Sequence, residues 1–173
     1  MLRRKGRPPG TQEKRDRFVV GRRIQDRPHE INTRKVFGHW EVDTVVSSRG
    51  KSKGFLATFV ERKTRFYVAI PMKDRTKESM FHAIRLLHTA FTNKVLKSFT
   101  TDRSKGFTCH EEVERLLGIL VYIADAYSAW QRGSNENSNS LLREFFPMLN
   151  NRPRKSLGSK FPFDMFKHEL SIV

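Results

Sequence analysis

The sequence is poor in cysteine and contains no long apolar run. Its 173 residues include one cysteine, Cys109, which excludes an internal disulfide framework and a zinc site built from several cysteines. No apolar stretch approaches the roughly 18 residues that a transmembrane helix needs, and the N-terminus lacks the apolar core of a signal peptide. These absences make a cytosolic compartment the expectation and argue against a membrane location.

Acidic residues are also scarce relative to basic ones. The chain has 18 Asp and Glu against 34 Lys and Arg, a formal net charge of +16. Such an excess predicts a polyanionic partner: DNA, RNA or, less strongly here, an acidic membrane surface. The sequence has no Gly-rich phosphate loop and no GxSxG elbow, so neither a nucleoside-triphosphate enzyme nor a serine hydrolase is supported.

Residues 1–35 are predicted to be a basic, flexible arm or linker. The first ten, Met-Leu-Arg-Arg-Lys-Gly-Arg-Pro-Pro-Gly, combine positive charge with helix and strand breakers and cannot bury apolar surface. Two interpretations stay open for this arm: it binds phosphates, or it is only a soluble tail.

The hydrophobic pattern after the arm predicts three strands followed by alternating helices and strands. The expected elements are strands at 40–47, 55–61 and 65–72, a helix at 76–91, a strand at 95–101, a helix from 108, a strand at 119–123 and a helix at 134–146. The short links between the first three strands favour an antiparallel meander. We expect a capping box at 108–111 to open the second helix, Gly118 to end it, and the apolar strand 119–123 to be central. The predicted fold is α/β, a ribonuclease-H-like mixed sheet with a three-strand antiparallel meander, two further strands and flanking helices.

Three acidic residues are placed for metal-dependent phosphodiester chemistry. Asp43 lies within the first strand, Asp102 ends the fourth, and Glu136 follows on the last helix after 33 intervening residues. Two strand aspartates and a helix glutamate can hold two divalent metals. A single aspartate at a strand end is more often a cap or turn residue. For Asp43 the alternative to a metal is a buried salt bridge to Arg65 or Lys63.

The segment around Glu136 is unusual for a structural helix. Residues 134–140 are rich in Ser and Asn, which are poor helix formers but suit a surface that meets a phosphate backbone. Trp130 could stack on a displaced base or could simply anchor the loop to the core. His39 is predicted to be an ordinary strand-flanking residue.

Four blocks of the sequence, in order, resemble bacterial insertion-sequence transposases of the IS-thirty type. They are Gly-His-Trp-Glu-Val-Asp at 38–43, Phe-Val-Glu-Arg-Lys-Thr-Arg-Phe at 59–66, Ser-Ala-Trp-Gln-Arg-Gly-Ser-Asn-Glu-Asn at 128–137 and Leu-Asn-Asn-Arg-Pro-Arg-Lys-Ser-Leu-Gly at 149–158. More distantly, the chain is similar to retroviral integrase cores. The resemblance implies a catalytic core at 36–147 and a shortened basic C-terminal segment at 148–173.

The resemblance implies a DDE transposase that cleaves DNA and transfers the cut strand. Asp43, Asp102 and Glu136 would be the catalytic residues and the ligands of Mg²⁺ or Mn²⁺, and the substrates would be inverted-repeat DNA ends and target DNA. The resemblance also implies a location in the bacterial cytoplasm, associated with the nucleoid, and leaves a homo-oligomer open. The residues expected to contact DNA are Arg3, Arg4, Lys5, Arg7, Trp130, Gln131, Arg132, Asn135, Asn139, Arg152, Arg154 and Lys155.

Departures from the family pattern support an alternative interpretation. After Asp102 the family usually has Asp-x-Gly-x-Glu-Phe, whereas this chain has Asp-Arg-Ser-Lys-Gly-Phe. We expect strain at Ser104, because glycine tolerates backbone angles that serine does not. The chain also begins without the family's helix-turn-helix and is short after Pro147. The alternative is a truncated, non-catalytic DNA-binding remnant; a ribonuclease H acting on RNA–DNA hybrids has less support.

Overall fold

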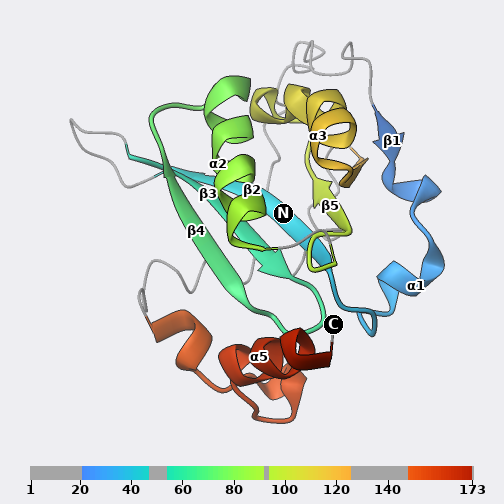
Figure 1. The fold of residues 1–173 in the computed structure, drawn as a ribbon, viewed down its shortest axis with the longest axis vertical. Coiled ribbons are helices and arrows are strands. Elements are labelled where there is room, and N and C mark those ends of the chain that lie inside the picture. Colours follow the sequence, from blue (N-terminus) through green and yellow to red (C-terminus); the bar gives the residue numbers. More distant parts are fainter. Residues whose placement is uncertain (1–20, 47–53, 92–93, 126–147, 173) are drawn as a thin grey trace, which may run out of the picture.

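The computed structural model describes residues 21–46, 54–91, 94–125 and 148–172 (Figure 1). These residues form a six-stranded sheet in the order β1-β6-β5-β2-β3-β4. Strands β2 (His39–Val46), β3 (Phe55–Glu61) and β4 (Tyr67–Met72) form the predicted antiparallel meander. Strands β5 (Ser98–Thr101) and β6 (Leu120–Ile123) add to β2 in parallel. The α/β mixed sheet predicted from the sequence is therefore confirmed.

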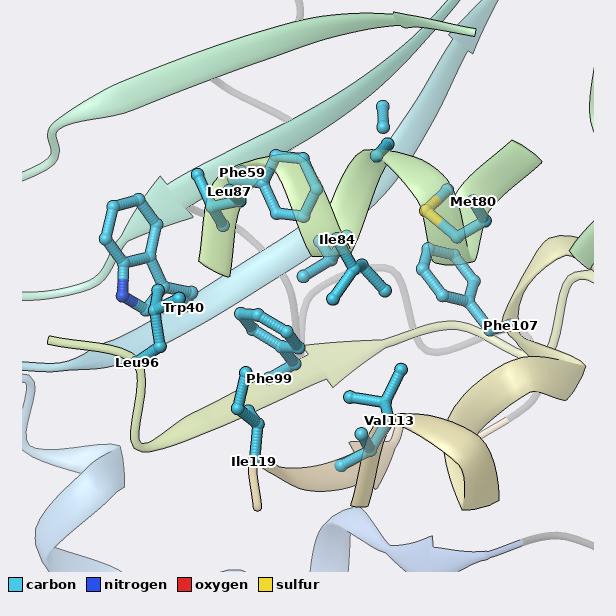
Figure 2. Packing of buried hydrophobic residues seen from close by; sticks show 14 of the residues in the cluster. Trp40, Phe59, Met80, Ile84, Leu87, Leu96, Phe99, Phe107, Val113 and Ile119 are labelled. Atoms are coloured by element: carbon cyan, nitrogen blue, oxygen red, sulfur yellow. The ribbon is translucent and has the colours of Figure 1, made fainter. Parts of the chain in front are cut away.

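One face of the sheet carries the main apolar core. Helix α2 (Lys77–Ala90) covers it with the predicted apolar stripe of Met80, Ala83, Ile84 and Leu87, all of them buried. The sheet contributes Trp40, Val42, Phe59 and Phe99 from three neighbouring strands (Figure 2). Because side chains alternate along a strand, Glu41, Asp43 and Val45 project from the opposite face.

The second helix begins later than the capping box predicted. A 3-10 helix, η3 (Lys105–Cys109), leads directly into α3 (His110–Leu117), whose N-cap is Cys109 with no side-chain cap hydrogen bond. The backbone N–H of His110 already bonds to the carbonyl of Phe107 in the preceding turn. The predicted capping box at 108–111 is therefore wrong. Gly118 ends α3 as predicted, in the left-handed conformation at φ 68°.

The N-terminal side of the fold is more ordered than the sequence suggested. Within the predicted arm, the structure has β1 (Arg22–Arg23), the 3-10 helix η2 (Ile24–Asp26) and α1 (His29–Asn32). Strand β1 pairs in parallel with β6. Buried Ile24 and Ile31 hold this segment to the domain. Strand β6, predicted to be central, is instead next to the short edge strand β1, and β5 and β2 occupy the centre.

The C-terminal residues pack against the end of the sheet at the β3–β4 turn (Figure 1). Two 3-10 helices, η5 (Met148–Asn151) and η6 (Lys155–Leu157), precede α5 (Pro162–Ile172). Phe166 of α5 joins the main core and stacks on Phe66 with ring centroids 4.0 Å apart. The expected helix at 134–146 lies outside the described residues. Among the described helices, none is long and apolar enough to cross a membrane.

Candidate active site

Asp43 lies on β2, and Asp102 directly follows the neighbouring parallel strand β5. The β2–β5 register pairs His39 with Ser98 and Glu41 with Thr100. Continued by two residues, this register reaches Asp43 on β2 and Asp102, which directly follows β5. Both aspartates are half-buried. Side chains two residues apart along a strand share a face, so the Asp43 carboxylate belongs, with Glu41, to the face opposite the main core.

The backbone orients each of these two carboxylates. Asp43 Oδ1 accepts a hydrogen bond from the N–H of Thr44 at 2.8 Å, and Asp102 Oδ1 accepts one from the N–H of Ser104 at 3.0 Å. Asp43 is also anchored through its carbonyl, which accepts a hydrogen bond from the Thr58 hydroxyl at 3.3 Å. Lys63, considered from the sequence as a salt-bridge partner for Asp43, pairs instead with Glu169 at 2.5 Å.

The serine that replaces the family glycine after Asp102 is not strained. Ser104 has φ −72° and ψ 154°, an extended conformation open to any residue. The turn keeps its shape because the Ser104 N–H bonds to the Asp102 side chain. The expected strain at Ser104 is therefore wrong, and this argument against an intact site is removed.

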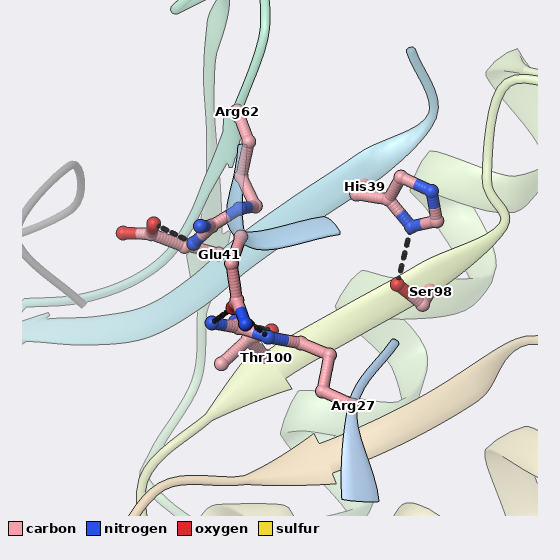
Figure 3. Close-up of polar contacts among 7 residues, drawn as sticks. Arg27, His39, Glu41, Arg62, Ser98 and Thr100 are labelled. Atoms are coloured by element: carbon pink, nitrogen blue, oxygen red, sulfur yellow. Dashed lines mark hydrogen bonds and ion pairs between the residues drawn. The ribbon is translucent and has the colours of Figure 1, made fainter. Parts of the chain in front are cut away.

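The fully buried acids of the sheet are Glu41 and Glu61, not Asp43. Glu41 is 0% exposed and forms an ion pair with Arg62, which is 3% exposed. Thr100, the β5 partner of Glu41, accepts a hydrogen bond from buried Arg27 at 3.0 Å (Figure 3). Burial lowers the pKa of Arg27 to about 10 and also lowers the pKa of Arg62. Both guanidinium groups remain charged at neutral pH.

Sequence reasoning missed this arginine pair. Two facts could have predicted it. Strand alternation puts Glu41 on the same face as Asp43, and a glutamate buried there needs a cationic partner. Arg62 could then have been suggested from the β2–β3 pairing, whereas Arg27 comes from a segment expected to be an arm.

Glu61 stabilises the β3–β4 turn. Burial raises its pKa, while hydrogen bonds from Thr64 and Gly38 act in the opposite direction. The Thr64 N–H and hydroxyl donate to Oε2 at 2.6 and 2.7 Å, and the Gly38 N–H donates to Oε1 at 3.1 Å. Gly38 has φ 99°, a conformation that favours glycine. Gly38 and Glu61 therefore have structural roles: Glu61 accepts the hydrogen bonds of the turn, and Gly38 adopts the backbone conformation that brings its N–H to Glu61.

His39 is the first residue of β2 and is buried. Its Nδ1 lies 2.7 Å from Ser98 Oγ. Burial, followed by the nearby charges of Lys97, Arg62 and Arg27, lowers the pKa of His39 to about 4. The imidazole is therefore neutral at physiological pH.

The expected DNA-contacting residues are only partly within the described structure. Arg152 and Lys155 are exposed. Arg154 is half-buried, and its guanidinium donates a hydrogen bond to the Leu149 carbonyl at 3.3 Å. The other predicted residues lie outside the described ranges: Glu136, Arg3, Arg4, Lys5, Arg7, Trp130, Gln131, Arg132, Asn135 and Asn139. Within those ranges, no group of three His, Cys, Asp or Glu side chains is arranged to hold a metal ion.

Structural comparison defines the class of fold. The chain resembles the catalytic core domain of BIV integrase, with a TM-score of 0.56 and 16% identity over 78% of this chain and 97% of that one. The predicted ribonuclease-H-like fold is confirmed by this match. A family model for the integrase core domain matches residues 33–129. The chain belongs to the integrase core domain family.

Sequence relatives narrow the resemblance to insertion-sequence transposases, as predicted. The chain is 32% identical to the transposase InsI for insertion sequence element IS30A of Escherichia coli, over 90% of this chain and 45% of the relative. It is also 32% identical to the transposase for insertion sequence element IS4351 of Bacteroides fragilis, over 96% of this chain and 57% of that protein. The chain thus spans about half the length of these curated relatives.

Proposed function

We propose that this chain is the catalytic core of a DDE transposase that cleaves DNA and transfers the cut strand. The observation that carries the proposal is the parallel β2–β5 register, whose last pair, Glu41 and Thr100, lies two residues before Asp43 and Asp102. Glu136, in the block that resembles the family's third acid, would complete the trio. Membership of the integrase core domain family supports this assignment.

The donor set fits a hard divalent cation. Asp43 and Asp102 offer carboxylate oxygens, the ligand type that Mg²⁺ and Mn²⁺ prefer. A bound metal pair supplies charge stabilisation for the attacking and leaving oxygens of a phosphodiester. The chain's own contribution is orientation: the N–H groups of Thr44 and Ser104 hold the two carboxylates in place before any metal arrives.

The charge of the chain supports DNA as the substrate. The net charge of +16 favours binding to phosphate backbones, and Arg152 and Lys155 present exposed cationic side chains. We extend the proposal to the predicted contacts outside the described residues, namely the basic N-terminal arm and the block from Trp130 to Asn139. Inverted-repeat ends and target DNA in the bacterial cytoplasm, bound by a homo-oligomer, complete the proposal.

Metal-dependent nicking of supercoiled DNA tests the assignment. Wild-type chain should nick the plasmid with Mg²⁺ or Mn²⁺ and not with EDTA, and calorimetric titration should detect Mn²⁺ binding. Asp43→Asn, Asp102→Asn and Glu136→Gln should each lower the nicking rate by at least about 10³-fold, because each removes one charged metal ligand.

Asp164→Asn is the matched control, because Asp164 is an exposed carboxylate on α5. It should nick and bind Mn²⁺ like the wild type. Mn²⁺ binding that survives in both Asp43→Asn and Asp102→Asn would overturn the metal assignment. Mn²⁺ binding without any nicking would favour the non-catalytic remnant.

A further inference from the structure

A row of four buried polar side chains crosses the sheet immediately before the two candidate metal ligands. Glu41 and Thr100 are partners across β2 and β5, and each lies two residues before an aspartate on its own strand. Residues two apart on a strand share a face and are roughly 7 Å apart. Along the two strands, the Glu41–Thr100 pair therefore lies directly before Asp43 and Asp102.

Each member of that pair is bound by an arginine from another part of the chain. Arg62, just after β3, forms an ion pair with Glu41. Arg27, between η2 and α1, donates to Thr100 and is itself held by Asn32, with 3.0 Å between Arg27 Nε and Asn32 Oδ1. Figure 3 shows both contacts, the Arg62–Glu41 ion pair and the Arg27–Thr100 hydrogen bond. The row thus connects β3, β2, β5 and the N-terminal segment.

General stability is a weak explanation for such a row. Removing ions from water costs several kcal/mol each, and well-packed apolar side chains often serve a fold as well or better. Here two buried arginines lie near one buried glutamate: Arg62 forms an ion pair with Glu41, whereas the hydrogen bonds of Arg27 go to the neutral side chains of Thr100 and Asn32. The Nε of Arg62 has no hydrogen-bond partner within the described part of the chain. The desolvation cost of these buried charges indicates that they have a role at this position in the sheet, next to the two aspartates.

The end of β5 shows what that role is. Regular pairing of β5 ends at Thr101, so Asp102 lies just beyond the strand. The Glu41–Thr100 pair is the last β2–β5 pair in the register. Its side chains therefore fix how closely, and with what twist, the two strands approach before they reach the aspartates.

We propose that Arg62 and Arg27, acting through Glu41 and Thr100, are positioning residues that set the spacing of Asp43 and Asp102 for divalent-metal binding. This inference rests on the proposed function, because it takes the two aspartates to be metal ligands. Groups that orient metal ligands typically affect metal affinity 10- to 100-fold. The arginines act one step behind the aspartates, so we expect the lower end of that range.

Calorimetric Mn²⁺ titration of the purified full chain, paired with thermal unfolding without metal, tests the inference. Arg62→Lys keeps the charge but loses the planar guanidinium, and Thr100→Val is nearly isosteric and removes the acceptor for Arg27. Each should raise the Kd for Mn²⁺ about tenfold. Thr100→Val keeps the test valid if Arg62→Lys does not fold.

Lys63→Met is the matched control, because it breaks the neighbouring Lys63–Glu169 ion pair, which faces α5 and not the aspartates. It should lower Tm, by less than the arginine variant because this pair is partly exposed, while leaving the Kd for Mn²⁺ unchanged. An unchanged Kd in both Arg62→Lys and Thr100→Val, in a chain whose Mn²⁺ binding is abolished by Asp43→Asn, would overturn the positioning role alone. Mn²⁺ binding unaffected by Asp43→Asn would instead overturn the proposed function.

Discussion

At the scale of single residues, His39 illustrates how burial controls protonation. Its pKa in the folded chain is about 4, below the ordinary value of 6.5, because burial penalises the charged imidazolium. The unfolded chain binds this proton more readily than the folded chain does. The stabilising contribution is therefore fully present above pH 6.5 and is lost progressively as the pH falls toward 4.

Replacing His39 by Asn should remove that pH dependence. Asn retains a polar atom near the position of Nδ1 and does not titrate. Between pH 7 and pH 4, wild-type chain should lose roughly 3 kcal/mol more unfolding free energy than His39→Asn. Urea unfolding at both pH values measures the difference. The exposed helix residue His82 provides the control, and His82→Asn should follow the wild type.

Burial of individual acids was the part of the site that the sequence predicted least well. The local pattern indicated Asp43 as the acid deepest in an apolar run, yet Glu41 and Glu61 are the buried ones. Glu41 is buried because Arg62 lies beside it, 21 positions later in the chain. The hydrophobicity of neighbouring residues carries no information on such long-range partners, so the pattern could not rank Glu41 above Asp43.

At the scale of secondary-structure elements, the buried aromatic side chain of α5 is its main contact with the core. Phe166 is 3% exposed and packs against Phe37, Trp40, Phe66 and Phe91. Phe163, on the same helix, is 48% exposed. The two phenylalanines therefore provide a matched comparison of buried and exposed positions.

Phe166→Ala should destabilise the domain by about 3–5 kcal/mol, because it leaves a cavity among aromatic rings. Phe163→Ala should cost less than about 1 kcal/mol. Chemical unfolding measured on both variants tests this ordering. Similar losses for the two would mean that α5 does not depend on Phe166 for docking.

Helices and strands whose own residues carry the apolar pattern and the cap were predicted well. Elements that are held in place by residues far away in the sequence were not. Strand β3 has the predicted bounds, and α2 begins after the Thr76 N-cap, whose side chain accepts from Ser79 N–H. The segment of β1, η2 and α1 was predicted as an arm because its composition is polar. Its order comes from two isolated isoleucines, Ile24 and Ile31, and from Arg27, which reaches Thr100 across the fold.

At the scale of the whole molecule, the excess of basic residues should dominate DNA binding. Each phosphate contact contributes about −0.9 to the slope of log K against log salt concentration for duplex DNA. Arg152 and Lys155 are exposed, whereas Arg154 is half-buried against the Leu149 carbonyl. Neighbouring cations in one basic segment thus have different expected roles.

The double variant Arg152→Gln/Lys155→Gln should reduce the magnitude of the salt slope by about 1.8, since two phosphate contacts are lost. Arg154→Gln should lower Tm by a few degrees and change the slope less. Fluorescence anisotropy with a short duplex over a range of salt concentrations provides the slopes. A slope change confined to Arg154→Gln would reverse these assignments.

The β2–β5 register also limits which changes in chain length the gene can tolerate. The β2–β5 pairing ends two residues before Asp43 and Asp102, so a shift of one residue in either strand would change the level of one aspartate relative to the other and reverse the faces of the shifted strand. Insertions and deletions are therefore incompatible with the stretches 39–43 and 98–102. The connections outside them can lengthen at an entropic cost that rises only slowly with loop length. Length variation among descendants of this gene should accumulate in those connections, while substitutions remain free to occur throughout the strands.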